Sequence, residues 1–185
     1  MFQRLNKRLR TDILRRLGFY THRAIGQFLT LLAYHLSSDE IIPFDLPNYG
    51  VALRDYYTAL NSTISSADFD LDISEIDSAI TTFETRAAEV TALRDLAILR
   101  NDNDLITVVN HKYRDFSRGF VSQGGLPDRE FYRNVVVAPG IDTGYAPVTF
   151  PGVTEAVMYG NETRAVDWVG RTARGILRAS EIIKT

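Results

Sequence analysis

The chain has 185 residues, of which 45% are apolar and 24% charged, and its formal net charge is only -2 at pH 7. This length suits one domain with a sizeable core, and the balanced charge argues against disorder and against a nucleic-acid partner. The sequence contains no cysteine, which excludes disulfides, zinc–thiolate sites and thiol nucleophiles.

The N-terminus is expected to form a basic amphipathic helix. Residues 1–23 contain seven Lys or Arg residues against one acid, and apolar residues recur every four positions at Leu5, Leu9, Ile13 and Leu17. We interpret residues 1–20 as a helix that lies on the domain or as the remnant of a preceding region. A secretory or organellar leader is the alternative.

A second helix is predicted over about residues 21–37. Its apolar part, residues 24–36, is 13 residues long and includes Gln27 and His35, whereas a membrane span needs about 20 apolar residues. The apolar residues that share one side are Ile25, Leu29, Leu32 and Leu36. The pattern predicts a buried core helix.

The next helix is predicted to begin after a proline-rich break. Pro43 and Pro47 cannot lie inside a helix, and Asp45 is a good N-cap with proline in the first turn behind it. We expect this helix to continue to about Asn61.

Residues 74–100 are predicted to form the longest helix. Ser74 and Asp77 have the spacing of a capping box. Apolar residues follow at steps of four and three, which predicts a seam for a neighbouring helix. They are Ile76, Ile80, Phe83, Ala87 and Val90.

The acidic segment before this helix resembles the first part of a calcium loop. Asp68, Asp70 and Asp72 have the spacing of its first three ligands, but Ile73 and Ala79 stand where the loop needs glycine and glutamate. We therefore interpret the three carboxylates as an acidic approach to the helix N-terminus.

Two further helices are predicted, over about residues 105–118 and 163–184. The first presents Ile106, Val109 and Tyr113 on one side. The second has apolar or small residues at steps of three and four, and glycine and alanine leave it slim enough for a close neighbour. The residues at these steps are Val166, Val169, Ala173, Ile176, Ser180 and Ile183, and the small residues that leave the helix slim are Gly170, Ala173, Gly175 and Ala179.

The helical period disappears between Gly119 and Gly152. These 34 residues hold four of the six prolines and six of the twelve glycines, and an irregular connection this long is usually functional. Only residues 134–139, NVVVAP, are expected to be extended and partly buried. The predicted fold is all-α: an antiparallel four-helix bundle, up-down-up-down, with a long ordered Pro/Gly-rich segment before the last helix.

Catalytic motifs are absent from the sequence. His22, His35 and His111 are isolated, without HExxH spacing, and no GxSxG, P-loop or GxGxxG occurs. We predict that the chain is not an enzyme on its own; a lone enzyme that uses His111 with nearby acids is a weaker alternative. Asn61 and Asn161 begin Asn-x-Ser/Thr sequons, which matter only if the chain is secreted.

The Pro/Gly-rich segment resembles a known family. GGLPDREFYRNVVVAPG at 124–140 and GYAPVTFPGVTEA at 144–156 are similar in order and spacing to the C-terminal domain of the transferrin receptor and glutamate carboxypeptidase family. IIPFDLPNYGVALRDYY and SEIDSAITTFETRA resemble two of its helices, so the domain is expected to cover residues 21–185. The signature residues are Gly125, Leu126, Pro127, Asp128, Arg129, Phe131, Tyr132, Arg133, Phe150, Pro151 and Gly152.

The resemblance implies a non-catalytic homodimerisation domain. In the family's peptidases the two zinc ions and the general base belong to a protease-like domain, so no metal or cofactor is expected in these residues. The implied partners are a second copy and the protease-like and apical domains of the parent, with neither nucleic acid nor membrane contacted by this domain. The implied location is the secretory pathway, a vacuolar lumen or the extracellular side of a membrane. A receptor-type parent without peptidase activity is the alternative.

One substrate contact is also implied. In the family's carboxypeptidases a Lys-Tyr pair from this segment grips the carboxylate of a C-terminal glutamate; Tyr145 matches the tyrosine, but Gly144 replaces the lysine. The charge-assisted contact would be lost, which weakens the expected preference for a glutamate end. Arg129 and Arg133 are expected to bond carbonyls or carboxylates. The aromatic residues expected to anchor the segment on the bundle are Phe131, Tyr132 and Phe150.

Overall fold

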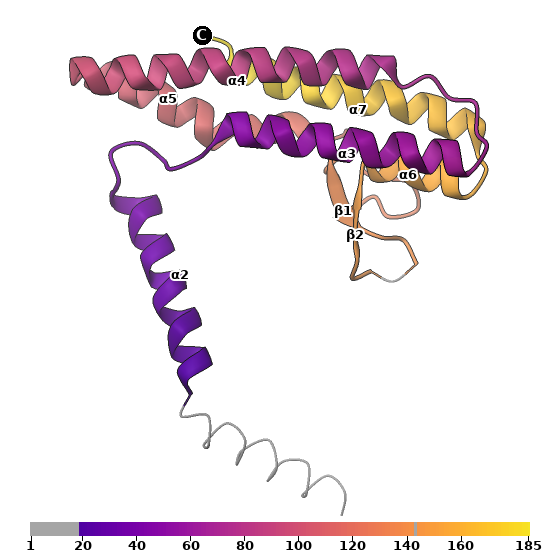
Figure 1. Ribbon diagram of the computed structural model, residues 1–185, viewed down its shortest axis with the longest axis horizontal. Helices are drawn as coiled ribbons and strands as arrows, with labels where there is room; N and C mark the ends of the chain where they lie inside the picture. Colours follow the sequence, from indigo (N-terminus) through magenta and orange to yellow (C-terminus); the bar gives the residue numbers. More distant parts are fainter. Residues whose placement is uncertain (1–18, 143) are drawn as a thin grey trace, which may run out of the picture. The chain divides into compact units, whose positions relative to one another are not determined.

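The computed structural model describes residues 19–142 and 144–185 (Figure 1). They divide into two units, one that ends at Pro43 and one that covers Phe44–Thr185. The predicted basic helix and its apolar repeat at positions 5–17 lie outside the described residues. The predicted boundary between residues 20 and 21 stays a prediction.

The first unit contains α2, Tyr20–Ser38, which matches the predicted helix to within one residue at each end. None of its side chains is buried: Ile25 is 54% exposed and Leu29 is 55% exposed. The expectation of a buried core helix is therefore wrong within this unit. The apolar pattern specified the helix correctly, but residues 19–43, the described part of the unit, contain no second helix or strand to cover it. No helix in the described residues is long and apolar enough to cross a membrane.

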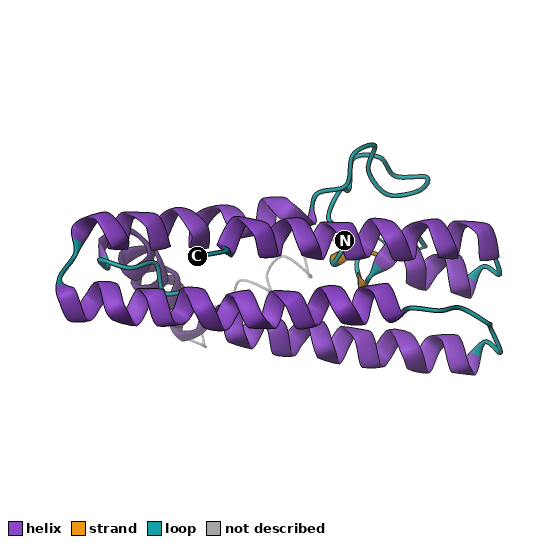
Figure 2. Cartoon of the chain, turned by 90° about the horizontal axis from the view of Figure 1, so that it is seen from above, coloured by secondary structure: helices purple, strands orange, loops and turns teal. Residues whose placement is uncertain are grey.

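The second unit is mostly helical, with one small sheet (Figure 1). Its elements are α3 (Leu46–Ser66), α4 (Ser74–Arg100), α5 (Asn103–Asp115), the 3-10 helix η1 (Phe116–Phe120), β1 (Val137–Pro139), β2 (Pro147–Thr149), α6 (Pro151–Met158) and α7 (Glu162–Ile183). α4 packs against α3, α5 and α7, and α6 packs against α3 and α7. The helices lie lengthwise beside one another (Figure 2).

The start of α3 follows its sequence signals. The Asp45 carboxylate accepts a hydrogen bond from the Asn48 N–H at 3.0 Å, and proline occupies the first turn. The helix continues to Ser66, five residues beyond the predicted end at Asn61. Its last residues include serines, which favour loops, but Ile64 is only 6% exposed and its packing keeps the last turn helical.

α4 has the predicted bounds but not the predicted cap. Ile73 is its N-cap residue, and the Ser74 N–H donates to the Asp72 carboxylate at 2.8 Å. Ser74 is already inside the helix, so the predicted capping box is wrong. The hydrogen bond from Ser74 lowers the pKa of Asp72, in keeping with the expected acidic approach to this helix.

α5 begins earlier than predicted because Asp102 caps it, accepting hydrogen bonds from the N–H groups of Asp104 and Leu105. It ends at Asp115, where the chain tightens into η1 instead of continuing to residue 118. The predicted inward residues are all buried: Ile106, Val109 and Tyr113.

The core centres on the seam between α4 and α7. All five predicted α4 seam residues are buried, and so are the predicted inward residues of α7 except Val166, which is 59% exposed. Ala165 and Trp168 take the inward positions in that turn instead. Beside the seam, Tyr49 stacks on Phe120 with ring centroids 5.5 Å apart, and burial raises the pKa of Tyr49 to about 12.

The predicted all-α fold with one long irregular segment needs two corrections in that segment and just after it. β1 and β2 form an antiparallel pair, with Val137 opposite Thr149, so the last three residues of the predicted extended run are a strand. α6 was not expected, because proline and glycine at its start suggest a loop; proline is nevertheless well suited to a first helical turn. Three helices are long, at 21, 27 and 22 residues, whereas α5 and α6 have 13 and 8.

The small residues predicted on the last helix allow neighbouring segments to pack closely against it. A Cβ on Gly175 would lie 2.6 Å from Cγ2 of Val135, and one on Gly119 would lie 2.2 Å from the backbone nitrogen of Ala179. η1 and the residues after it can therefore approach α7 only because these positions lack side chains.

Removal of the α3 cap should lower stability measurably. We expect Asp45→Ala to reduce the free energy of unfolding by about 1 kcal/mol, because the Asn48 N–H loses its acceptor. Urea unfolding followed by circular dichroism measures this change. The matched control is Asp70→Ala in the exposed acidic segment, which should change stability by less than about 0.5 kcal/mol. Equal losses in the two variants would contradict the capping role.

Candidate functional site

The segment from residue 121 to residue 150, called the ribbon below, is held by backbone and amide hydrogen bonds. Val121 and Asn134 form an isolated antiparallel bridge. The Asn134 side-chain oxygen accepts from the N–H groups of Val136 and Val137 at 2.8 and 3.1 Å. The Phe150 N–H donates to the Val136 carbonyl at 2.8 Å. These bonds give an irregular sequence one defined path.

Two glycines allow the ribbon and α6 to pack closely. Gly125 has a φ of +76°, and a Cβ there would lie 2.1 Å from the Glu130 carbonyl oxygen. A Cβ on Gly152 would lie 2.2 Å from the Trp168 ring, so α6 meets α7 at van der Waals distance. Both positions exclude a side chain, which explains glycine at these two signature positions.

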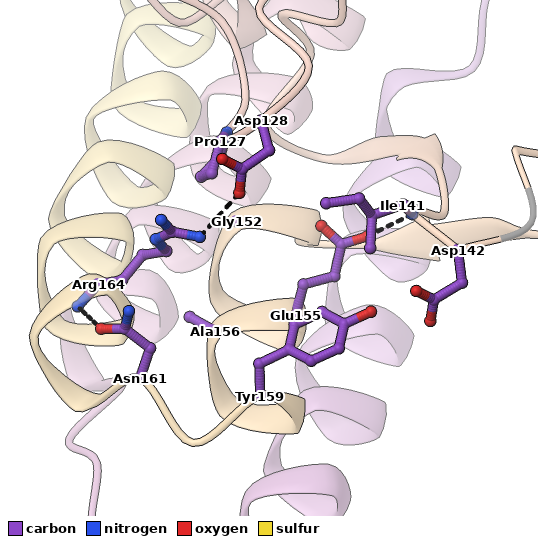
Figure 3. Close-up of a pocket in the computed structure, with 10 residues that line it drawn as sticks. All are labelled: Pro127, Asp128, Ile141, Asp142, Gly152, Glu155, Ala156, Tyr159, Asn161 and Arg164. Carbon is purple, nitrogen blue, oxygen red and sulfur yellow. Dashed lines mark hydrogen bonds and ion pairs between the residues drawn. The ribbon is translucent and has the colours of Figure 1, made fainter.

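A buried ion pair joins the ribbon to α6. Arg129 Nη2 lies 2.6 Å from Glu155 Oε2, and the two side chains are 10% and 11% exposed. The other oxygen of Glu155 accepts the Ile141 N–H at 3.0 Å (Figure 3). One carboxylate therefore holds two parts of the ribbon. Arg129 Nε and Nη1 are buried without a partner among the described residues. The pair therefore positions the ribbon at a desolvation cost.

A pocket of about 340 Å³ lies between the ribbon, α6 and α7 (Figure 3). Asp128 on its wall pairs with Arg164 of α7 at 3.1 Å. A hydrogen bond to the Asp142 carboxylate raises the pKa of Tyr159. The lining residues are Pro127, Asp128, Ile141, Asp142, Gly152, Glu155, Ala156, Tyr159, Asn161 and Arg164. The Asp128 and Glu155 carboxylates are each engaged in an ion pair, so both hold the ribbon against α6 and α7.

The described residues do not offer a zinc site. Residues 19–142 and 144–185 contain no group of three or more His, Cys, Asp or Glu side chains placed to hold a metal. The His35 ring nitrogen lies 3.1 Å from the Asp39 carboxylate in an exposed pair one helical turn apart.

Tyr145 lies in the loop between β1 and β2 and is 95% exposed. The Gly140 N–H donates to the Ala146 carbonyl at 2.8 Å, and the Gly144 N–H donates to the Gly140 carbonyl at 3.0 Å. Gly144 has a φ of +65°, which suits glycine better than lysine. The loop is thus closed at its base and presents the Tyr145 ring outward.

The remaining signature residues separate into buried and exposed groups. Leu126 and Phe150 are buried, which agrees with an anchoring role for Phe150. Phe131 is 89% exposed and Tyr132 is 40% exposed, so the expectation that Phe131 anchors the ribbon is wrong. Arg129 bonds a carboxylate as expected, whereas the side chain of Arg133 lies on the surface. Pro127 is half-buried at the turn, and Pro151 begins α6.

The two sequon asparagines occupy different places. Asn61 is exposed but lies inside α3, not at a helix end as predicted. Asn161 is the N-cap of α7, and its side-chain oxygen accepts the Arg164 N–H at 3.0 Å. Its amide nitrogen, the atom that carries a glycan, is not used by this cap.

The sequence analysis did not single out Glu155, Arg164 or Trp168, which hold the ribbon from α6 and α7. Glu155 had one usable signal: it is the single charge in the apolar stretch PGVTEAV, where burial of a carboxylate calls for a partner. The sequence held no such signal for Arg164 and Trp168, because the residues that they contact lie far away in the sequence.

Comparison with known proteins decides the family. The model of the transferrin receptor-like dimerisation domain matches residues 71–184. The chain belongs to this family. It is 53% identical over 170 residues to a probable glutamate carboxypeptidase of Arthroderma benhamiae, with 91% of the chain and 23% of the relative covered.

More distant relatives of the dimerisation domain align over similar lengths. A probable glutamate carboxypeptidase of Arabidopsis thaliana is 24% identical, with 90% of the chain and 25% of the relative covered. An inactive zinc metalloprotease of Schizosaccharomyces pombe is 23% identical, with 86% and 21% covered. The chain spans about a quarter of the length of these relatives.

Breaking the Arg129–Glu155 ion pair should lower the stability of the domain. Glu155→Gln leaves the Arg129 guanidinium buried beside a neutral group, and we expect a loss of about 3 kcal/mol in the free energy of unfolding, measured by urea denaturation. The control is the double variant Arg129→Met, Glu155→Leu, which removes both charges and should lose less than Glu155→Gln. A double variant as unstable as Glu155→Gln would argue against an uncompensated buried charge as the cause.

Proposed function

We propose that this chain is the non-catalytic homodimerisation domain of a glutamate carboxypeptidase-like zinc metallopeptidase. The observation that carries the proposal is the family match over residues 71–184, together with 53% identity to a probable glutamate carboxypeptidase. The absence of a metal-holding group among the described residues is compatible with catalysis elsewhere in the parent. Zinc then belongs to a protease-like domain outside this chain.

The domain is proposed to work as a helical bundle within residues 21–185. α3, α4 and α7 are its long helices. The up-down-up-down order of a four-helix bundle remains part of the proposal. Its proposed partners are a second copy and the protease-like and apical domains of the parent. The proposed location is the secretory pathway, a vacuolar lumen or the extracellular side of a membrane, where Asn61 and Asn161 would be glycosylation sites.

Tyr145 is proposed to reach the substrate pocket of the parent. The side chain is 95% exposed on a loop whose neighbour Ile141 is fixed by Glu155. A tyrosine held in this way can approach another domain without reordering the ribbon. Because Gly144 supplies no ammonium group, the proposed site binds a C-terminal carboxylate more weakly than a Lys-Tyr pair does.

A receptor-type parent without peptidase activity is the second candidate. The name of the Schizosaccharomyces pombe relative, an inactive zinc metalloprotease, favours it. The two candidates differ in zinc binding and peptide hydrolysis by the full-length parent. In an active parent, Tyr145→Phe should raise the KM for substrates with a free C-terminal carboxylate while kcat changes little.

The dimerisation function is tested by sedimentation velocity of the 185-residue chain over a hundredfold range of concentration. We expect a reversible monomer–dimer equilibrium and an unchanged helical spectrum across the range. The purified chain should hydrolyse no acidic dipeptide with or without added zinc. A folded monomer at every concentration would overturn the dimerisation function, and zinc-dependent hydrolysis would overturn the non-catalytic assignment.

A further inference from the structure

A small hollow, called the arginine hollow below, lies between α7 and the first residues of the ribbon. It has a volume of about 210 Å³. Four residues of α7 and two of the ribbon line it: Asp167, Arg171, Arg174, Arg178, Ser122 and Gln123. Three guanidinium groups against one carboxylate give these side chains a net charge of +2. A concave surface with this charge attracts anions.

Two of the three arginines are held in place by their own chain. Arg178 donates from Nε to the Gly119 carbonyl at 3.2 Å and from Nη2 to the Val121 carbonyl at 3.0 Å. These carbonyls are neutral, so they orient the Arg178 guanidinium without compensating its charge. Arg171 is oriented by the Asp167 carboxylate, which lies 2.7 Å from its Nε. Both guanidinium groups are therefore positioned before any ligand arrives.

Arg174 lies between these two arginines and is unpaired. Within residues 19–142 and 144–185 its guanidinium takes part in no hydrogen bond or ion pair. A Cβ on Gly170 would lie 3.1 Å from Arg174 Nη1 and 3.7 Å from the Glu75 carboxylate, but Glu75 forms no ion pair with Arg174. Glu75 lowers the local positive potential and leaves the Arg174 donors available to a ligand.

The spacing of the three arginines is unfavourable for α7 itself. Arg171, Arg174 and Arg178 follow one another at steps of three and four, so their side chains lie on one side of the helix. Like charges at these steps destabilise a helix, and Asp167 offsets only one of the three. An anion placed among them would replace this repulsion with attraction.

The ribbon contributes a buried hydroxyl with a poor hydrogen bond. Ser122 is 5% exposed, and its hydroxyl donates to the Gln123 carbonyl at 3.4 Å. This distance is long for an O–H donor, which normally lies 2.5–3.0 Å from its acceptor. An anion oxygen in the hollow would satisfy the Ser122 hydroxyl better than the Gln123 carbonyl does.

We propose that the arginine hollow binds a dianionic oxyanion, namely a phosphate or sulfate group. Its volume is that of about seven water molecules, which is smaller than the roughly 300–1,000 Å³ of pockets for drug-sized ligands. One oxyanion group therefore fits it better than a peptide or a nucleotide. Guanidinium groups bind phosphate oxygens in pairs, and a dianion balances the net charge of the lining. This binding activity goes beyond the proposed dimerisation function and does not depend on it.

Calorimetric titration of the 185-residue chain with inorganic phosphate and with sulfate tests the site, at an ionic strength kept constant with chloride. We expect saturable binding of both ions. Arg174→Gln should raise both dissociation constants at least about tenfold, because a charge-assisted contact is lost. The matched control is Arg100→Gln, which removes the same charge from the exposed end of α4 and should raise them by no more than about twofold. Absence of saturable binding in the millimolar range, or equal effects of the two substitutions, would overturn the site.

Thermal unfolding separates a ligand-binding role of Arg174 from a structural one. Without phosphate or sulfate, Arg174→Gln should unfold at the wild-type temperature or slightly above it, because one of three like charges is removed. Sulfate should then raise the unfolding temperature of the wild-type chain more than that of the variant. A variant that is less stable without sulfate and gains as much from sulfate as the wild type would assign Arg174 a structural role and overturn the proposal.

A phosphate monoester distinguishes a free ion from an organic ligand. A hollow of about 690 Å³ shares Asp167 and Arg171 with the arginine hollow and is also lined by Trp168. Phenyl phosphate carries the same dianion, and its ring can lie in this neighbouring hollow. Tighter binding of phenyl phosphate than of inorganic phosphate would identify an organic monoester as the class of ligand, and weaker binding would identify the free ion. Both results support the site, provided that Arg174→Gln weakens the tighter ligand.

Discussion

The arrangement of the ribbon depends on one buried carboxylate. Glu155 of α6 bonds Arg129 in the turn after Gly125 and the Ile141 N–H at the base of the β1–β2 loop. A buried charge with hydrogen-bonding partners at fixed distances tolerates little displacement, because movement would leave a desolvated charge unpaired. This side chain therefore adds a polar link at two points to the other hydrogen bonds that hold the ribbon against the helical unit.

Glu155 can bind the ribbon in this way only because α6 packs closely on α7. The contact between Gly152 and Trp168 sets the distance between the two helices, and Arg164 of α7 pairs with Asp128 of the ribbon. Two helices thus hold the same turn from two sides. The Tyr145 loop is consequently attached to the helical unit through the packing of α6 and α7.

The sequence predicted those features of the fold that interactions between residues close in sequence determine. The N-cap at Asp45 and the bounds of α4 follow from hydrogen bonds and apolar periods within a few residues. Tertiary contacts decided the rest. Val166 fits the apolar period of α7 but is exposed, because Trp168 packs inward beside it. The role of Glu155 depends on its ion pair with Arg129, which lies 26 residues earlier in the sequence and contacts Glu155 only in the folded domain.

α7 supports the ribbon from within the helical unit. Its inner side, with Gly175 and Ala179, admits η1 and the ribbon at distances that no larger residue would allow. Arg164 near its start pairs with Asp128, so the same helix also holds the turn that Glu155 holds from α6. Close packing and ion pairs therefore act together to place the ribbon.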